Sequence, residues 1–326
     1  MEVETKVEPT KTEVPTTLRL RGLKKGDWAL LISRIRKGEC TPFLGAGACA
    51  GTLPLAREVA LKWGEDFDFP LRDRENLIQV AQFLAVDQLD PEFPKLLLQQ
   101  EFDGIPPPNF DRRDEVHSVL AELPLPIYIT TNYDDFMVRA LGTRGKQPVP
   151  QLCHWWGDEV DKLLQSTAKS DKVVSENLQA IFEQEPDFEP SPERPIVFHM
   201  HGNTKVPGTM VLTEDDYLDF LIKMGENKDL LPSRIRRAFT ENSLLFLGYS
   251  LNDSNFRVVF RSLVSYMRGN FGRAHVSVQL TPDGLPEEQL ENALKYLDSY
   301  FQKLKIHVYW GTCQEFTTDL RERMGI

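Results

Sequence analysis

Four short groups of residues combine glycines, amides, carboxylates and histidine in patterns that suit the recognition of phosphates and sugar hydroxyls. They are GAG at 45–47, TTNYD at 130–134, HMHGN at 199–203 and GYSLND at 248–253. Glycines allow a backbone to approach phosphates closely, amides and carboxylates hydrogen-bond hydroxyl groups, and an imidazole can accept a proton near neutral pH. Each group follows a short apolar run typical of a strand, so all four are expected at strand ends.

The first group, Gly45, Ala46 and Gly47, lies between an apolar run at 40–44 and a helix expected from Pro54 to Lys62. A strand, a glycine loop and a helix N-terminus in this order can bind a pyrophosphate through backbone N–H groups. The spacing G-x-G-x-x-x-G departs from the dinucleotide-binding G-x-G-x-x-G, and the Lys-Ser/Thr pair of a P-loop does not follow it. A tight turn without a ligand explains the glycines equally well.

Asn132 and Asp134 follow the strand expected at 127–130. Ligands of open α/β sheets bind outside the carboxyl ends of the strands, so an amide and a carboxylate at this place face the expected pocket. Asn132 can hydrogen-bond a sugar hydroxyl or orient a water molecule. Alternatively, Asp134 or Asp135 simply caps the helix that reaches Leu141.

His201 follows the strand expected at 196–199, and Gly202 permits a turn that exposes the imidazole. A purely structural role for this histidine is the alternative. The pair formed by His199 and His201 also suggests metal ligation, but no cysteine or H-x-x-E partner accompanies it. We therefore expect no metal at this position.

A fourth apolar run, 244–247, ends at Gly248, and small or polar residues follow it before a helix expected from Phe256. Ser250 and Asp253 can bind ribose hydroxyls. They can also cap the following helix, which is the expected role of at least one of them.

Strand-like apolar runs alternate with helical segments along most of the chain. The runs lie at 40–44, 127–130, 196–199, 244–247, 276–280 and 306–310. Helical periodicity is found at 24–37, 54–62, 77–86, 94–99, 114–122 and 286–302, and from about 314. This alternation predicts an α/β protein with a doubly wound, mainly parallel sheet.

The chain is expected to form one domain at 21–326, preceded by a flexible tail at 1–20. A helical insertion at about 65–122 can lie over the glycine loop. A polar insertion at about 155–194, with a Pro-rich end read as a loop, separates two core strands. C-terminal units at 270–326 follow and carry no residues that suggest chemistry.

Composition and charge narrow the class of protein. The 326 residues include 38 Lys and Arg against 49 Asp and Glu, a formal charge of −11 with a pI near 5.2. This excludes a phosphate-binding surface spread over the whole protein but leaves a local basic groove open. No apolar stretch approaches the roughly 20 residues of a membrane span. The four cysteines are scattered without a C-x-x-C pair, which fits a reducing cytoplasm.

Taken in this order, GAG, TTNYD, HG at 201–202 and GYSLND resemble the sirtuin-like (silent information regulator-like) family, specifically its NAD-hydrolysing branch in bacterial antiphage defence. The resemblance extends over about 43–257. It implies a Rossmann-like fold in which NAD, the substrate, lies across the carboxyl ends of the strands.

The resemblance also implies a role for each candidate residue. Asn132 and His201 would be catalytic, the amide beside the nicotinamide ribose and the imidazole acting on a ribose hydroxyl or on the attacking water. The binding residues would be Gly45, Ala46 and Gly47 over the phosphates and ribose, Asp134 shaping the pocket, and Gly248, Ser250 and Asp253 in the later loop.

Two departures from deacylating sirtuins bear on the reaction. Those enzymes carry a G-I-P-D-F-R stretch after the glycine loop, where this chain reads ACAGTLPLAR at 48–57, and a four-cysteine zinc-binding domain that this chain cannot assemble. We therefore expect no zinc ribbon and no metal, and cleavage of NAD by water to nicotinamide and ADP-ribose. The alternatives are a protein deacylase or ADP-ribosyltransferase, and a non-catalytic module that senses NAD or ADP-ribose.

Uncontrolled NAD cleavage would harm a host cell, so we expect the activity to be held back until a homo-oligomer or a regulatory partner assembles. Related effectors occur beside DNA-translocating ATPases, Argonaute-like proteins or sensor ATPases. Contact with nucleic acid is expected only through such a partner. The C-terminal units or the 21–37 helix are candidate docking surfaces, unless they only complete the core.

Overall fold

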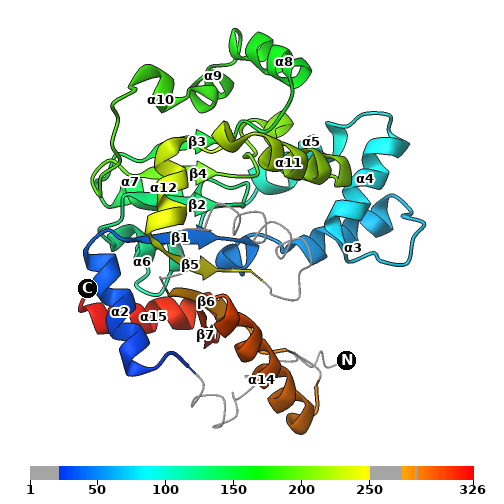
Figure 1. Cartoon of the computed structure of the whole chain (residues 1–326). Coiled ribbons are helices and arrows are strands. Elements are labelled where there is room, and N and C mark those ends of the chain that lie inside the picture. Colours follow the sequence, from blue (N-terminus) through cyan, green and yellow to red (C-terminus); the bar gives the residue numbers. More distant parts are fainter. Residues whose placement is uncertain (1–21, 250–273, 283–284) are drawn as a thin grey trace, which may run out of the picture.

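In the part of the chain that the structure describes, seven strands form one sheet in which every pairing is parallel (Figure 1). The structure, a computed structural model, describes residues 22–249, 274–282 and 285–326. The strand order is β3-β4-β2-β1-β5-β6-β7. The strands are β1 (Cys40–Leu44), β2 (Ile127–Thr130), β3 (Val149–Leu152), β4 (Ile196–His199), β5 (Ser243–Leu247), β6 (His275–Gln279) and β7 (Ile306–Trp310). The predicted doubly wound, Rossmann-like α/β fold is confirmed.

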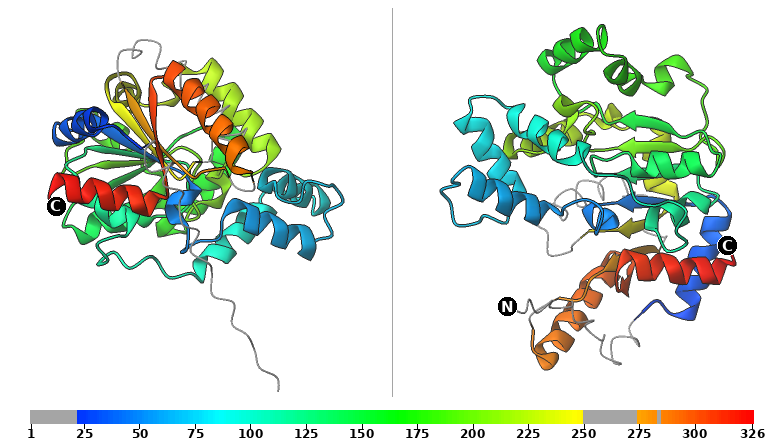
Figure 2. Two further views of the ribbon diagram at one scale, coloured as in Figure 1. Left: turned by 90° about the horizontal axis from the view of Figure 1, so that it is seen from below. Right: turned by 180° about the vertical axis from the view of Figure 1, so that it is seen from behind.

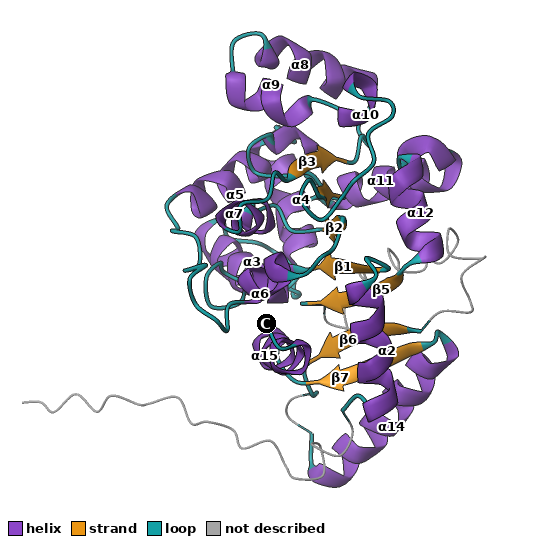
Figure 3. Ribbon diagram, turned by 90° about the vertical axis from the view of Figure 1, so that its left-hand side faces the viewer, coloured by secondary structure: helices purple, strands orange, loops and turns teal. Residues whose placement is uncertain are grey.

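Helices cover both faces of the sheet, which explains why the central strands are continuous apolar runs (Figure 3). One face packs against α12 (Ser233–Glu241) and α14 (Glu287–Lys303). The other packs against four helices: α2 (Lys25–Arg36), α6 (Val116–Glu122), α7 (Phe136–Thr143) and α15 (Cys313–Met324). Neighbouring residues alternate between the two cores, as Phe43 and Leu44 do on β1.

The carboxyl ends of the four central strands are level with one another. Leu44 at the end of β1 is in register with Thr130 of β2 and with Leu247 of β5, and Thr130 is in register with His199 of β4. The loops that follow these strands therefore leave the sheet at the same edge. The chain also changes direction in the sheet here, because β2 lies on one side of β1 and β5 on the other.

A group of helices extends beyond this edge (Figures 1 and 2). It consists of α3 (Ala56–Asp66), α4 (Leu77–Asp87), α5 (Phe93–Asp103) and α11 (Glu214–Glu226). Helices α3 to α5 form a separate apolar core, in which Trp63, Val80 and Leu98 pack with Met210 and Leu212. This group, here called the helical wall, stands over the loops that follow the central strands.

Two regions differ from the sequence-based expectations. β3 was not expected because Pro150 and Gln151 interrupt its apolar pattern; proline is tolerated there because β3 is an edge strand. The polar insertion contains α8 (Asp158–Ala168), α9 (Lys172–Leu178) and α10 (Ile181–Gln184) as well as loops. Short 3-10 helices occupy Ala46–Cys49, Pro207–Thr209 and Lys228–Leu230. The tail at 1–20 and the helix expected from Phe256 lie outside the described residues.

Within the described part of the chain, no helix has the length and apolarity needed to cross a bilayer.

Candidate functional site

A pocket of about 680 Å³ opens between the carboxyl edge of the sheet and the helical wall. This volume lies within the range of small-molecule sites. The loops after β1, β2, β4 and β5 form its floor, and residues of α3, α4, α5 and α11 form its side. Five of the residues predicted from sequence line it: Ala46, Asn132, Asp134, His201 and Gly248. Asn132 and His201, 69 positions apart in the chain, thus face the same space.

The glycine loop forms the 3-10 helix at Ala46–Cys49, and its backbone is bound to the loop after β5. Gly45 N donates to Leu247 O and Gly47 N donates to Gly248 O, each at 2.9 Å. A Cβ on Gly47 would lie 2.9 Å from Gly248 Cα. The close approach of two backbones therefore requires these glycines, and Gly45 and Gly47 do not themselves line the pocket.

This arrangement limits the binding of a pyrophosphate by the backbone N–H groups of the glycine loop, which the sequence suggested. The N–H groups of Gly45, Gly47 and Ala48 already have backbone acceptors, so they are not available to a pyrophosphate. Ala46 is exposed in the pocket. Ser250 and Asp253, the other expected binding residues, lie outside the described residues.

The Asn132 side chain is held in one orientation. Its Nδ2 donates to Gly45 O at 3.1 Å and to Cys49 Sγ at 3.2 Å, and its backbone N–H donates to Thr130 Oγ1 at 2.9 Å. A carbonyl oxygen such as Gly45 O can be met only by the amide NH₂, which turns Oδ1 the other way. Asn132 lines the pocket, and among the described residues no group donates a hydrogen bond to its Oδ1.

Asp134 serves two purposes. Its Oδ1 accepts from the N–H of Phe136, the first residue of α7, so Asp134 satisfies this donor although Asp135 occupies the N-cap position. Its Oδ2 accepts from the Cys49 thiol at 3.2 Å. Asp135, the alternative cap, instead forms an ion pair with Lys205 at 2.8 Å.

His201 is buried in an aromatic setting, so the expectation that the turn at Gly202 exposes its imidazole is wrong. Its ring lies edge-on to Tyr217 and Phe220 of α11, with centroid distances of 5.4 and 5.0 Å. Its Nε2 has no hydrogen-bonding partner among the described residues. Burial lowers the pKa of His201 to about 3, so its imidazole is neutral at pH 7. His199 lies deeper, is buried, and does not line the pocket.

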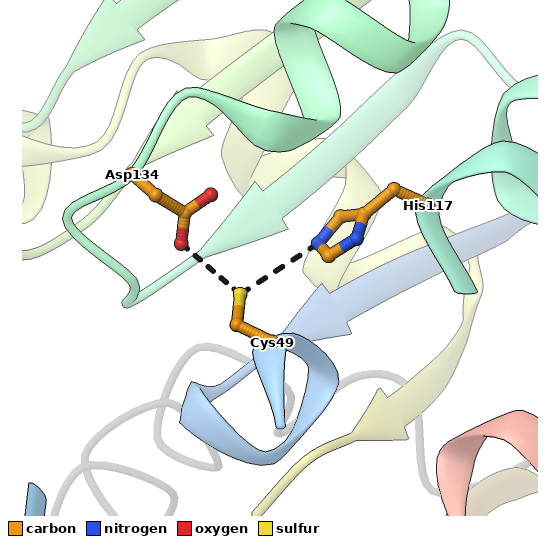
Figure 4. Close-up of side chains that lie close together, drawn as sticks. All are labelled: Cys49, His117 and Asp134. Atoms are coloured by element: carbon orange, nitrogen blue, oxygen red, sulfur yellow. Dashed lines mark hydrogen bonds between the residues drawn. The ribbon is translucent and has the colours of Figure 1, made fainter. Parts of the chain in front are cut away.

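A cysteine, a histidine and an aspartate meet at the pocket floor, a cluster that the sequence did not reveal (Figure 4). Cys49 Sγ lies 3.9 Å from His117 Nε2 and 3.2 Å from Asp134 Oδ2. The other ring nitrogen of His117 contacts Glu115 Oε1 at 2.8 Å. Burial, followed by the neighbouring Asp134 carboxylate, raises the pKa of Cys49 well above its usual value, so the thiol stays protonated. Only the clustering of side-chain types in space identifies this group.

The side of the pocket also carries charge that the sequence did not single out. Arg57 of α3 forms an ion pair with Glu75 at 2.5 Å, and Asp73 lines the same region. Both partners of the pair are more than half exposed, so water screens their attraction. Arg57 is therefore a cation that an anionic ligand can reach.

Comparison with known proteins places this geometry in a family. The family model described as "SIR2-like domain" matches residues 126–308, which is more than half of the chain. A protein named NAD(+) hydrolase ThsA from Cytobacillus dafuensis is 25% identical over 283 residues, covering 84% of this chain and 48% of that protein. Proteins of the same name from Acinetobacter baumannii and Bacillus cereus are 24% identical over 250 residues and 27% over 183 residues.

The match to these relatives is partial on their side. The Acinetobacter baumannii alignment covers 74% of this chain and 42% of the relative, and the Bacillus cereus alignment covers 56% and 31%. The chain thus spans about half, or less, of the length of the curated relatives that it matches. The family model matches more than half of the chain, and the parallel sheet and the level strand ends that carry Asn132 and His201 agree with it. This chain belongs to the SIR2-like family.

Proposed function

We propose that the chain is an NAD⁺ hydrolase that breaks the bond between nicotinamide and ribose and transfers the ADP-ribosyl group to water. The observation that carries this proposal is the meeting of Asn132 and His201 in one pocket at the carboxyl edge of the sheet. Membership of the SIR2-like family and the names of three relatives support it. The pocket has room for a ligand of dinucleotide size.

Asn132 would act on the charge that develops during the reaction. Loss of nicotinamide leaves positive charge on the ribose, and a fixed dipole aimed at that charge lowers the barrier because it needs no reorientation. The hydrogen bonds to Gly45 O and Cys49 Sγ supply that fixation. The amide oxygen is then free to face the ribose or to hold the attacking water.

His201 would act as a hydrogen-bond acceptor for a ribose hydroxyl or for water. A group with a pKa of about 3 is a weak base at pH 7, so it orients a partner better than it removes a proton. The rings of Tyr217 and Phe220 limit its rotation. Its Nε2 is buried and has no partner among the described residues, so a ligand hydroxyl or water that reached it after a small movement of the surrounding rings would supply the missing hydrogen bond.

Arg57 would contact the pyrophosphate, because three N–H groups of the glycine loop, those of Gly45, Gly47 and Ala48, are already used within the protein. A ligand phosphate would compete with Glu75 for the guanidinium. Arg57→Gln should raise KM for NAD about two- to fivefold and Glu75→Gln should lower it, as expected for exposed charges. Lys62→Gln, one turn further along α3 in an exposed pair with Glu101, is the matched control and should leave KM unchanged.

The direct test is to incubate the purified protein with NAD and to identify nicotinamide and ADP-ribose by mass spectrometry. Asn132→Ala and His201→Ala should abolish nicotinamide release, whereas His154→Ala, on an exposed histidine, should not. Circular dichroism must show that all three variants fold. Full activity in either site variant would reject the assignment. Turnover that requires an acylated peptide would indicate a deacylase or transferase, and binding without turnover would indicate a sensor.

We further propose that the protein is a cytoplasmic effector of antiphage defence, as the sirtuin-like resemblance suggests, and that a homo-oligomer or a regulatory partner activates it. Helix α11 links surface and site: Tyr217 and Phe220 contact His201, while Leu218 and Ile222 are more than half exposed. A second copy of the chain bound over α11 would therefore act on His201. A fully active monomer in sedimentation and activity assays would contradict this regulation.

A further inference from the structure

The cluster of Cys49, His117 and Asp134 takes part in no chemical step of the proposed reaction, although Cys49 helps to orient Asn132, and it offers three good metal ligands. One ligand atom of each residue lies within 4.8 Å of those of the other two. The three side chains come from the 3-10 helix after β1, from α6 and from the loop after β2, and they point toward one another (Figure 4). Cys49 and His117 are buried, so they are held in place by packing.

The distances suit a small tetrahedral ion. Zn²⁺ bonds to sulfur at about 2.3 Å and to nitrogen or oxygen at about 2.0–2.2 Å, so its tetrahedral ligands lie roughly 3.3–3.6 Å apart. Cys49 Sγ lies 3.2 Å from Asp134 Oδ2 and 3.9 Å from His117 Nε2. The ligand atoms of His117 and Asp134 lie within 4.8 Å of each other, so side-chain shifts of up to about 1.5 Å would complete the geometry. Sulfur and imidazole ligands select such an ion over Mg²⁺ or Ca²⁺.

The surrounding hydrogen bonds already orient the ligand atoms. His117 Nδ1 contacts Glu115 Oε1 at 2.8 Å, which directs Nε2 toward Cys49, as in carboxylate–histidine–zinc sites. Asp134 uses Oδ1 to bind the Phe136 N–H, which leaves Oδ2 for the cluster. Cys49 and Asp134 line the pocket and His117 does not, so the fourth coordination position would face the pocket.

We propose that Cys49, His117 and Asp134 form a reversible binding site for a thiophilic divalent cation, best matched by Zn²⁺, and that the bound ion inhibits NAD cleavage. Binding would form a Zn–S bond and release the thiol proton to solvent. The ion would take the sulfur that now accepts from Asn132 Nδ2. It would also place positive charge beside the ribose, where positive charge develops in the reaction. This inhibitory effect rests on the proposed NAD hydrolase activity; the binding itself does not.

Binding can be tested without any activity assay. The full chain, freed of metal with a chelator that is then removed, is titrated with Zn²⁺ against a chromophoric competitor, and with Co²⁺ as an absorbing substitute. We expect one ion per chain and a thiolate-to-cobalt charge-transfer band. Cys49→Ser and His117→Gln should each weaken Zn²⁺ binding by at least about 100-fold. The matched controls Cys313→Ser and His154→Gln should bind as the parent chain does.

The result that would overturn the site is equal Zn²⁺ affinity in the parent chain and the folded Cys49→Ser variant, or a cobalt complex without the thiolate band. Because a buried histidine is replaced, thermal unfolding must show that His117→Gln is folded. If it is not, the nearly isosteric Cys49→Ser variant decides the outcome.

Inhibition is tested by NAD cleavage at increasing Zn²⁺. Half-inhibition should require at least about 100-fold more Zn²⁺ in His117→Gln than in the parent chain, following the loss of affinity. Cleavage that continues with the site filled would overturn the inhibitory role. Zn²⁺ binding without NAD cleavage under any condition would contradict the proposed function and leave the site in place. Cleavage without Zn²⁺ binding would do the reverse.

Discussion

Replacing Gly248 by alanine should break the junction between the two loops that form the pocket floor. Gly248 has φ of +79°, a conformation that residues with a side chain rarely adopt. A Cβ at this position would lie 2.3 Å from Ala48 N and 2.5 Å from Gly45 O. Both atoms belong to the backbone of the glycine loop, so no side-chain rotation can relieve the contact.

Three costs combine in this variant. The left-handed conformation costs an alanine about 1 kcal/mol. Moving the loops apart breaks the hydrogen bond from Gly47 N to Gly248 O, which contributes about 1 kcal/mol. Overpacking against a fixed backbone adds about 1–3 kcal/mol. The free energy of unfolding should therefore fall by about 3–5 kcal/mol, and NAD cleavage should be lost because Asn132 is held by Gly45 O in the same loop.

Urea unfolding with two matched variants separates these costs. Gly145 has φ of +72° with nothing within 4 Å of a Cβ, so Gly145→Ala should show only the conformational cost of about 1 kcal/mol. Gly142 lies in α7 with an ordinary φ and open space, so Gly142→Ala should be stabilising by up to about 1 kcal/mol. The reasoning is refuted if Gly248→Ala proves no more costly than Gly145→Ala.

Two further predictions concern stability. Burial lowers the pKa of His275 from 6.5 to about 4, so between these pH values the histidine is protonated only in the unfolded chain. The free energy of unfolding should therefore fall by about 1.4 kcal/mol for each unit by which the pH decreases in this range. Urea unfolding at several pH values should show this slope in the parent chain and not in His275→Gln. Lys95 and Asp216 form a buried ion pair at 2.8 Å between α5 and α11. Lys95→Ala should cost about 3–5 kcal/mol in thermal or urea unfolding, and a change as small as that of the exposed Lys62→Ala would contradict this.

The strands of the sheet could be predicted from sequence because burial on both faces requires uninterrupted apolar runs. The ranges 40–44, 127–130, 196–199 and 306–310 match the observed strands at both ends, and those of β5 and β6 differ by at most one residue. β3 was not predicted because an edge strand is less buried than a central one, so its sequence need not be uniformly apolar. The helices of the polar insertion were not predicted because polar residues dominate their segment, in which Leu164, Val174 and Ile181 are the residues buried in the core.

The site was predictable only where topology alone decides it. Parallel strands with level ends bring the residues that follow them to one edge, so Asn132 and His201 could be placed together without knowing any packing detail. The contact between Cys49 and His117 depends instead on how the first turn of α6 packs on the 3-10 helix after β1. Nothing in local sequence specifies such a tertiary contact. The same holds for Arg57, whose position at the pocket follows from the placement of the helical wall.

The pocket floor and the helical wall are stabilised by different interactions, and this separation predicts how substitutions will divide between catalysis and binding. The floor is fixed by backbone hydrogen bonds between the loops after β1 and β5, which orient Asn132. The wall has its own apolar core and joins the floor through Met210 and Leu212, which belong to the loop after β4 and pack in that core. Leu84→Ala in this core should therefore raise KM by loosening the pocket side while leaving kcat nearly unchanged. Asn132 is held by the floor, and His201 is held by Tyr217 and Phe220 of α11, which lie outside the core that contains Leu84.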